Sequence, residues 1–92
     1  MEKVLTLLGF AHKAGQLAIG RSAVLTAKKV YAIVLARDAS EKNRLIAQDR
    51  QVAVHMCGTK EELGRILGRD QVAIIAILDQ GFARAIGSAL AD

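Results

Sequence analysis

Residues 31–36 (YAIVLA) and 72–77 (VAIIAI) decide the fold of this 92-residue chain. Both runs are continuously apolar, have the length of a strand and are rich in β-branched residues. A strand that covers a core on one face alternates polar and apolar residues, whereas a continuous apolar run indicates burial on both faces. We therefore expect these runs to be the two central strands of a sheet with helices on each side.

Shorter strands and amphipathic helices are expected to alternate with these two runs. The further strands are expected at residues 17–19 and 52–56. The helices are expected at residues 3–14, from 20 to about 29, from 40 to about 49, from 59 to 67 and from 79 onward. This alternation predicts an α/β fold, a three-layer α/β/α sandwich with a mixed sheet of about four strands, in a single domain over residues 1–92.

Glycine and small polar residues mark the expected helix ends. Gly15 should end the first helix in a left-handed conformation, and Ser40 is a favourable N-cap for the third. Thr59 and Glu62 have the spacing of a capping box at the start of the fourth helix. Gly9 lies inside the first helix, where we expect a close contact with a neighbouring element.

The composition excludes several classes of function. Aromatic residues make up only 3% of the chain, so the core must be aliphatic, and RNA binding that stacks bases on several exposed rings is disfavoured. No apolar run approaches the roughly 18 residues of a membrane span, and no signal peptide is recognised. The single cysteine excludes an internal disulfide and a cysteine-clustered zinc site, and it suits a reducing cytoplasm. We expect no metal and no cofactor.

Positive charge is concentrated in the first part of the chain. Residues 1–37 carry six basic side chains and one acidic side chain, a net charge of +5, whereas residues 38–92 carry seven basic and eight acidic side chains, a net charge of −1. A basic half indicates a polyanionic partner, with nucleic acid favoured over an anionic membrane surface. A small basic domain without a nucleic-acid partner is the alternative.

The turn at Gly20 and the helix after it are the most informative segment. Glycine lets backbone amides approach a phosphate closely, and a helix N-terminus favours anions. Helical spacing places a row of polar and basic side chains on or beside the outward face of this helix: Arg21, Ser22, Thr26, Lys28 and Lys29. Such a face can enter a groove of folded RNA, although an ordinary solvated helix face has the same pattern.

Two pairs of residues allow an enzymatic alternative. Asp38 and Asp79 each follow a buried strand, as paired catalytic carboxylates would, but both also suit the N-terminus of a helix. His55 and Cys57 alternate at the end of a strand and so face the same side, but no sequence signature supplies an orienting group or an oxyanion site. The GxGxxG and GxxxxGK[ST] nucleotide-binding patterns are absent. Structural roles are favoured for all four residues.

Four segments together resemble a known family: residues 9–20 (GFAHKAGQLAIG), 35–40 (LARDAS), 59–68 (TKEELGRILG) and 72–82 (VAIIAILDQGF). Over nearly its full length the chain is similar to kink-turn-type ribosomal proteins, the seven-Ae/thirty-e superfamily of the large subunit, and most of all to its small stand-alone bacterial members. The resemblance implies an α/β/α domain without catalysis that binds a sharply bent helix–internal loop–helix in RNA.

The resemblance also assigns positions within this sequence. Gly20 matches the family glycine that opens the RNA-contacting helix. The typical Asn-Glu pair and following lysine fall on Ser22, Ala23 and Thr26, and none of the three is retained. The family's apolar loop before the last strand is shorter here and has the sequence Arg-Asp-Gln at residues 69–71. These departures argue against standard kink-turn recognition, while binding through phosphates can persist.

Together these observations predict a non-catalytic, cytoplasmic, ribosomal-protein-like domain that binds structured RNA, with ribosomal RNA favoured and DNA not expected, as a monomer or weak homodimer. The predicted RNA-binding residues are Lys13, Gly20, Arg21, Ser22, Thr26, Lys28, Lys29, Arg37 and Arg69. The alternative is a protein-interaction module on the same fold with an incidental basic patch, for which exposed Leu25 would contact a partner or a second copy.

Overall fold

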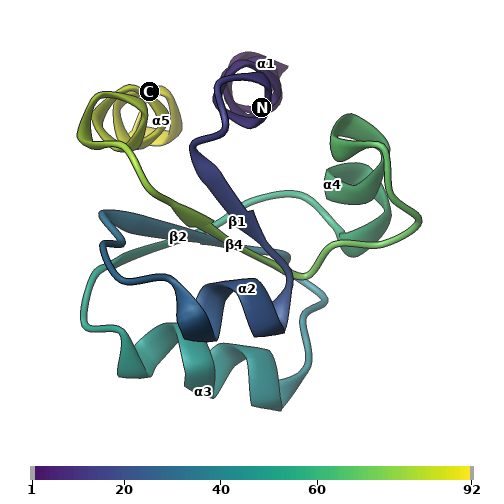
Figure 1. Cartoon of the computed structure of the whole chain (residues 1–92). Coiled ribbons are helices and arrows are strands. Elements are labelled where there is room, and N and C mark those ends of the chain that lie inside the picture. Colours follow the sequence, from purple (N-terminus) through teal and green to yellow (C-terminus); the bar gives the residue numbers. More distant parts are fainter. Residues whose placement is uncertain (1, 92) are drawn as a thin grey trace.

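The computed structural model describes residues 2–91, which form five helices and four strands. In chain order these are α1 (Glu2–Lys13), β1 (Leu17–Ile19), α2 (Arg21–Thr26), β2 (Ala32–Leu35), α3 (Glu41–Asp49), β3 (Ala53–Met56), α4 (Lys60–Leu67), β4 (Ile74–Ile77) and α5 (Gln80–Ala91). Helices α1, α4 and α5 lie on one side of the sheet and α2 and α3 on the other (Figure 1). The predicted three-layer sandwich is confirmed.

The four strands form one mixed sheet in the order β1-β4-β2-β3. Strand β4 runs antiparallel to both of its neighbours, while β2 and β3 are parallel. Every residue of β2 and β4 is buried, so the two apolar runs are the central strands, as predicted. Strand β3 lies at the sheet edge, and most of its residues are exposed.

The core is aliphatic, as the composition requires. Its largest fully buried side chains are Leu8, Ile33, Leu63, Ile74, Ile75, Ile77 and Ile86. No aromatic side chain belongs to the buried set among the described residues: Phe10 is 55% exposed and Tyr31 is 41% exposed, while Phe82 packs against the core from its margin. Two of the three rings are therefore available on the surface.

The predicted helix ends are confirmed where the signal is local. The Ser40 hydroxyl accepts from the Asn43 amide, and Thr59 and Glu62 form both bonds of the capping box. Gly15 adopts a φ of 72° directly after α1. Within residues 2–91, no helix combines the length and the hydropathy that crossing a membrane requires.

Helix α2 is shorter than predicted, because it ends at Thr26 and not near Lys29. Ala27 is extended, with a ψ of 131°. The Thr26 hydroxyl donates to the carbonyls of Ser22 and Ala23, a local bonding pattern that competes with helix continuation. The following segment must instead reach the sheet, where the Tyr31 amide donates to the carbonyl of Ile77.

The prediction of a close contact at Gly9 is wrong. A close contact occurs instead at Gly64. A Cβ built on Gly9 would meet no atom within 4 Å, because the first helix presents that position to open space. A Cβ built on Gly64 would lie 2.7 Å from the carbonyl oxygens of both Arg69 and Asp70. The loop before β4 therefore packs directly on the backbone of α4, which only glycine permits.

These two helical glycines give a matched test. We expect Gly64→Ala to destabilise the protein, because overpacking against backbone atoms costs about 1–3 kcal/mol and exceeds the helix-propensity gain of about 1 kcal/mol. Gly9→Ala should keep that gain and leave the protein equally or more stable. The free energy of unfolding in urea measures both, and a Gly64→Ala variant as stable as Gly9→Ala would contradict the packing described here.

Candidate functional site

Three of the predicted segments meet at one end of the sheet, which we call the Gly20 end. The Gly20 amide donates to the Ile74 carbonyl at 3.0 Å, and Ile74 pairs with Leu35 of β2. Just beyond this pair, the Ala36 amide donates to the Ala73 carbonyl at 2.9 Å. The antiparallel direction of β4 thus places the turn after β1, the loop after β2 and the loop before β4 side by side.

Gly20 gives this end an open helix start. Its φ of 92° and ψ of 165° are a conformation that favours glycine, and no side chain caps the N-terminus of α2. Ser22 is exposed on the first turn, and Thr26 is exposed one turn later on the same face. Because the Thr26 hydroxyl donates back to α2, it is less available to an external partner.

Arg21 lies at the junction of α2 and α3. Its Nε donates to Oδ1 of Asn43 at 3.1 Å, and Asn43 is the buried polar side chain of the described core. One guanidinium N–H group is thereby fixed, which orients the group and leaves other donors to face a phosphate. Sequence reasoning missed Asn43, although its position four residues before buried Ala47 places it on the inward face of α3.

A second arginine that the sequence analysis did not single out holds the loop after β2. Nη2 of Arg44 donates to the Arg37 carbonyl at 3.1 Å, and its Nε donates to the Ala39 carbonyl at 3.3 Å. The Arg37 amide in turn donates to the Gly58 carbonyl at 2.8 Å. Both the amide and the carbonyl of Arg37 are thus hydrogen-bonded, while Arg37 as a whole remains exposed.

The loop before β4 completes the Gly20 end. Gly68 ends α4 with a φ of 72°, and the Arg69 amide donates to the Gly64 carbonyl at 2.8 Å. Arg69, Asp70 and Gln71 are all exposed in this loop. Arg21, Arg37 and Arg69 therefore belong to three segments whose main chains meet at this end of the sheet.

The other predicted basic residues lie at the opposite end of the sheet. Lys13 ends α1, just before the turn where the Leu78 amide donates to the Gln16 carbonyl. Lys28 and Lys29 follow α2 and precede β2 at the same end. The nine predicted residues thus divide between two ends, with Thr26 on α2 between them.

The topology separates the two aspartates of the enzymatic alternative. They follow β2 and β4, which are antiparallel, so Asp38 lies at the Gly20 end and Asp79 at the other. Oδ2 of Asp79 accepts from the Phe82 amide at 2.9 Å and caps α5, as predicted. Oδ1 of Asp38 accepts from the Lys60 amide at 2.8 Å, so it serves the N-terminus of α4 and not that of α3.

The structure also disfavours a catalytic pair of Cys57 and His55. The Cys57 side chain is fully buried, and this burial raises the pKa of its thiol above the ordinary value of 9.0, which disfavours the reactive thiolate. His55 faces α5, where its Nε2 would lie 3.6 Å from a Cβ on Gly87. Across residues 2–91, no three His, Cys, Asp or Glu side chains are grouped to hold a metal ion.

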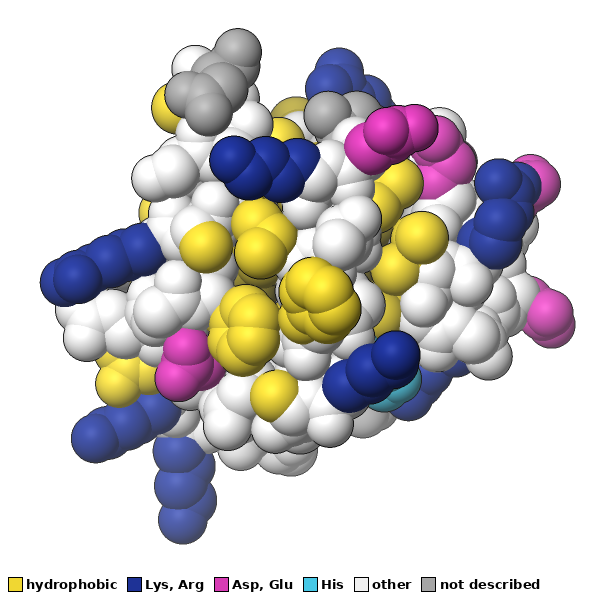
Figure 2. Space-filling view, turned by 90° about the horizontal axis from the view of Figure 1, so that it is seen from above, with side chains coloured by type: hydrophobic (Ala, Val, Ile, Leu, Met, Phe, Trp, Pro, Cys, Tyr) yellow, Lys and Arg dark blue, Asp and Glu magenta, His cyan; other side chains and the backbone are white. Residues whose placement is uncertain are grey.

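The face formed by α1 and α5 has a different character. Figure 2 shows hydrophobic side chains gathered at its centre, with basic side chains toward its rim. Phe10 is exposed on α1, and a shallow groove of about 310 Å³ is lined by Leu7, Phe82 and Ala85. This face is chemically unlike the arginine-bearing Gly20 end.

The capping bonds give a testable stability effect. Asp38→Ala and Asp79→Ala should each lower the free energy of unfolding by about 0.5–2 kcal/mol, and the corresponding Asn variants should recover most of the loss, because Asn also accepts from a helix amide. Thermal melts of the four variants measure this. Alanine variants that melt with the wild type would show that neither carboxylate stabilises a helix.

Comparison with known proteins agrees with this fold. Residues 2–86 match the ribosomal protein L7Ae/L30e/S12e/Gadd45 family model. A solved protein of unknown function from Bacillus halodurans shares 31% sequence identity with a TM-score of 0.86, and the match covers 98% of each chain. The 15.5kD RNA binding protein of Giardia lamblia shares the fold, with a TM-score of 0.73 and 17% identity over 97% of this chain and 82% of that one. No curated protein sequence matches. The chain belongs to the ribosomal protein L7Ae/L30e/S12e/Gadd45 family.

Proposed function

We propose that this protein is a non-catalytic RNA-binding protein that binds structured, kink-turn-like RNA through the Gly20 end, without a strong preference for the kink itself. The ligand that we propose, from the family, is ribosomal RNA, and the proposed place of action is the cytoplasm. The observation that carries the proposal is that the segments bearing Arg21, Arg37 and Arg69 meet at the end of the sheet with the uncapped turn at Gly20, in a member of this family. The solved Giardia protein of the same fold is described as an RNA-binding protein, which supports the same class of partner.

The chemistry of the Gly20 end favours phosphate contacts over base readout. Arginine presents several donors in a plane that matches phosphate oxygens, and three such residues come from segments held by main-chain bonds. In contrast, Ser22 and Ala23 carry short side chains, and the hydroxyl of Thr26 is bonded to its own helix. Phosphate contacts position an RNA without reading its bases. We therefore expect low sequence selectivity and little preference for a kinked over a straight RNA.

A protein-interaction role remains the second candidate, and one observation favours it. Phe10 is 55% exposed on α1, the helix that also contributes Leu7 to the groove lined by Phe82 and Ala85, and Leu25 is 56% exposed on α2. Exposed apolar patches often mark contact surfaces. The same protein can carry both roles, because the α1–α5 face does not overlap the Gly20 end.

The salt dependence of RNA binding tests the proposed function. If about three to five phosphates are neutralised, the affinity for a structured ribosomal RNA fragment should fall steeply between low and physiological salt. Arg37→Ala and Arg69→Ala should each weaken binding and reduce the salt slope by about one. Arg65→Ala is the matched control, because Arg65 is an exposed arginine of α4 that pairs with Glu61.

Titration of labelled RNA at several salt concentrations measures these slopes. A flat salt dependence, or no binding at low salt, would refute the proposed function. Equal effects of Arg65→Ala and of the two site variants would instead locate the interaction outside the Gly20 end.

Restoring the family's side chains on α2 tests base recognition. The wild type should bind a standard kink-turn with little preference over a straight duplex. The triple change Ser22→Asn, Ala23→Glu, Thr26→Lys should raise that preference, on a scale of about 1–3 kcal/mol for a good bidentate base contact. Competition of kink-turn against duplex measures the preference. Strong kink selectivity of the wild type would show that other residues supply the recognition.

A further inference from the structure

The far end of the sheet, opposite the Gly20 end, carries a cluster that the proposed RNA site does not use. We call it the Tyr31 end, and its residues are Lys13, Lys28, Lys29, Tyr31, Gln80 and Arg84. The main chain brings it together: the Tyr31 amide donates to the Ile77 carbonyl at 2.9 Å, and Gln80 begins α5 shortly after Ile77. Lys28 and Lys29 directly precede this pairing, so they and Tyr31 share one edge of the molecule.

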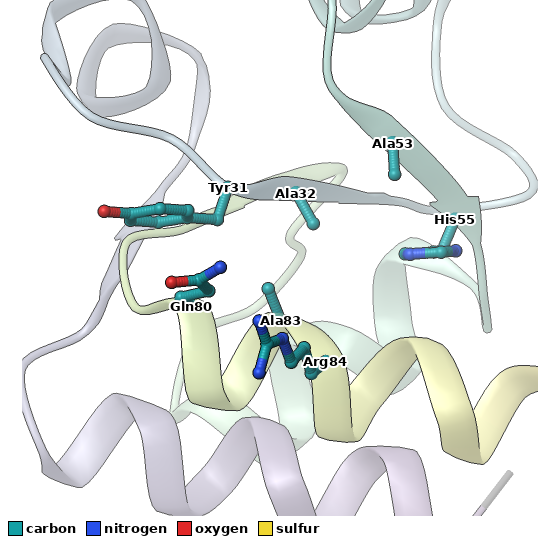
Figure 3. A pocket seen from close by; sticks show the side chains of 7 residues that line it. All are labelled: Tyr31, Ala32, Ala53, His55, Gln80, Ala83 and Arg84. Carbon is teal, nitrogen blue, oxygen red and sulfur yellow. The ribbon is translucent and has the colours of Figure 1, made fainter.

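Tyr31 is an accessible ring at the mouth of a pocket. It is 41% exposed, and it borders an open pocket of about 250 Å³ that is also lined by Gln80, Arg84 and His55. Figure 3 shows the ring lying over Gln80, with His55 of β3 on the far side of the pocket. A flat ring beside a pocket with amide, guanidinium and imidazole groups can accept one planar, polar ligand group.

The charges around this ring favour an anion. Lys13, Lys28, Lys29 and Arg84 are all exposed cations of this end. The acidic groups of this end are Asp79, whose Oδ2 accepts from the Phe82 amide, and Asp49 at the end of α3. An exposed ring interleaved with cations is the pattern by which proteins hold single-stranded nucleic acid, where a base stacks on the ring and phosphates meet the cations.

We propose that the Tyr31 end is a second RNA contact, which holds a single-stranded segment that extends from the structured RNA bound at the Gly20 end. One unstacked base lies against Tyr31, and the neighbouring phosphates contact Lys28, Lys29 and Arg84. A duplex does not fit this role, because its bases are already stacked and cannot offer a face to the ring. This inference rests on the proposed function and extends it to the flanking strand.

The dimensions of the molecule permit one RNA to reach both ends. The longest extent of the protein is 27 Å. At the stacked spacing of about 3.4 Å per nucleotide, a tail of roughly eight nucleotides spans that distance. Helix α2 lies between the two ends and exposes Ser22 and Thr26 along the way.

The test compares one structured RNA with and without a single-stranded tail of about ten nucleotides at either end. Wild type should bind a tailed RNA at least about fivefold more tightly than the untailed RNA, as one base–aromatic stack implies. Tyr31→Ala should remove this advantage and leave the untailed affinity unchanged, while Tyr31→Phe should retain it. Phe10→Ala is the matched control, because it removes an exposed ring on another face.

The contribution of Lys28 and Lys29 to binding of the tail is tested separately, because both residues are exposed in the segment between α2 and β2. Lys28→Glu combined with Lys29→Glu should abolish the tail advantage, and Lys3→Glu combined with Lys42→Glu should preserve it. A tail advantage that survives Tyr31→Ala, or no tail advantage in a wild type that binds the untailed RNA, overturns the inference.

Failure of the proposed function has a different signature. If the wild type does not bind the untailed RNA, the Gly20 end is not the RNA site that we propose. An isolated single-stranded oligonucleotide then decides the second contact: binding lost in Tyr31→Ala supports it, and absence of binding overturns it as well.

Discussion

The structure depends on the insertion of β4 between β1 and β2, antiparallel to both. Strand β4 is buried throughout, so its backbone groups must pair on both edges. This direction decides which loops meet. The turn after β1 and the loop after β2 leave the sheet where β4 enters it, which gathers Gly20, Arg37 and the 68–71 loop. A parallel β4 would have sent that loop to the other end.

The loop before β4 is held by a second constraint, its contact with α4. Gly64 allows the carbonyls of Arg69 and Asp70 to lie where any Cβ would collide. The left-handed Gly68 then turns the chain back, and the Arg69 amide bonds the Gly64 carbonyl. Two glycines four residues apart thus fix the position of an exposed arginine. These constraints act through the backbone, so the exposed side chains of residues 69–71 are not needed to hold the loop.

The scarcity of aromatic residues shapes the surface as well as the core. Aliphatic side chains fill the interior, and none of the aromatic rings in residues 2–91 is fully buried. Phe10 and Tyr31 are exposed on the surface. Their surroundings differ: Phe10 lies on the α1–α5 face, where hydrophobic side chains gather (Figure 2), whereas Tyr31 borders a pocket with Gln80, Arg84 and His55. An exposed ring among cations suits a nucleic-acid base, and one beside apolar side chains suits a protein surface. The two rings therefore point to two kinds of contact.

The sequence by itself determined the central strands and the capping of α3 and α4, because each of these signals lies within a few neighbouring residues. It also determined the aliphatic core through the composition, and the family through four segments spread along the chain. It did not determine the length of α2, the close approach at Gly64, the Arg21–Asn43 bond or the partner of Asp38, the amide of Lys60. Tertiary structure decided these, along with the division of the basic residues between two ends. Such features depend on the order and direction of strands distant in the chain, and local periodicity carries no information about either.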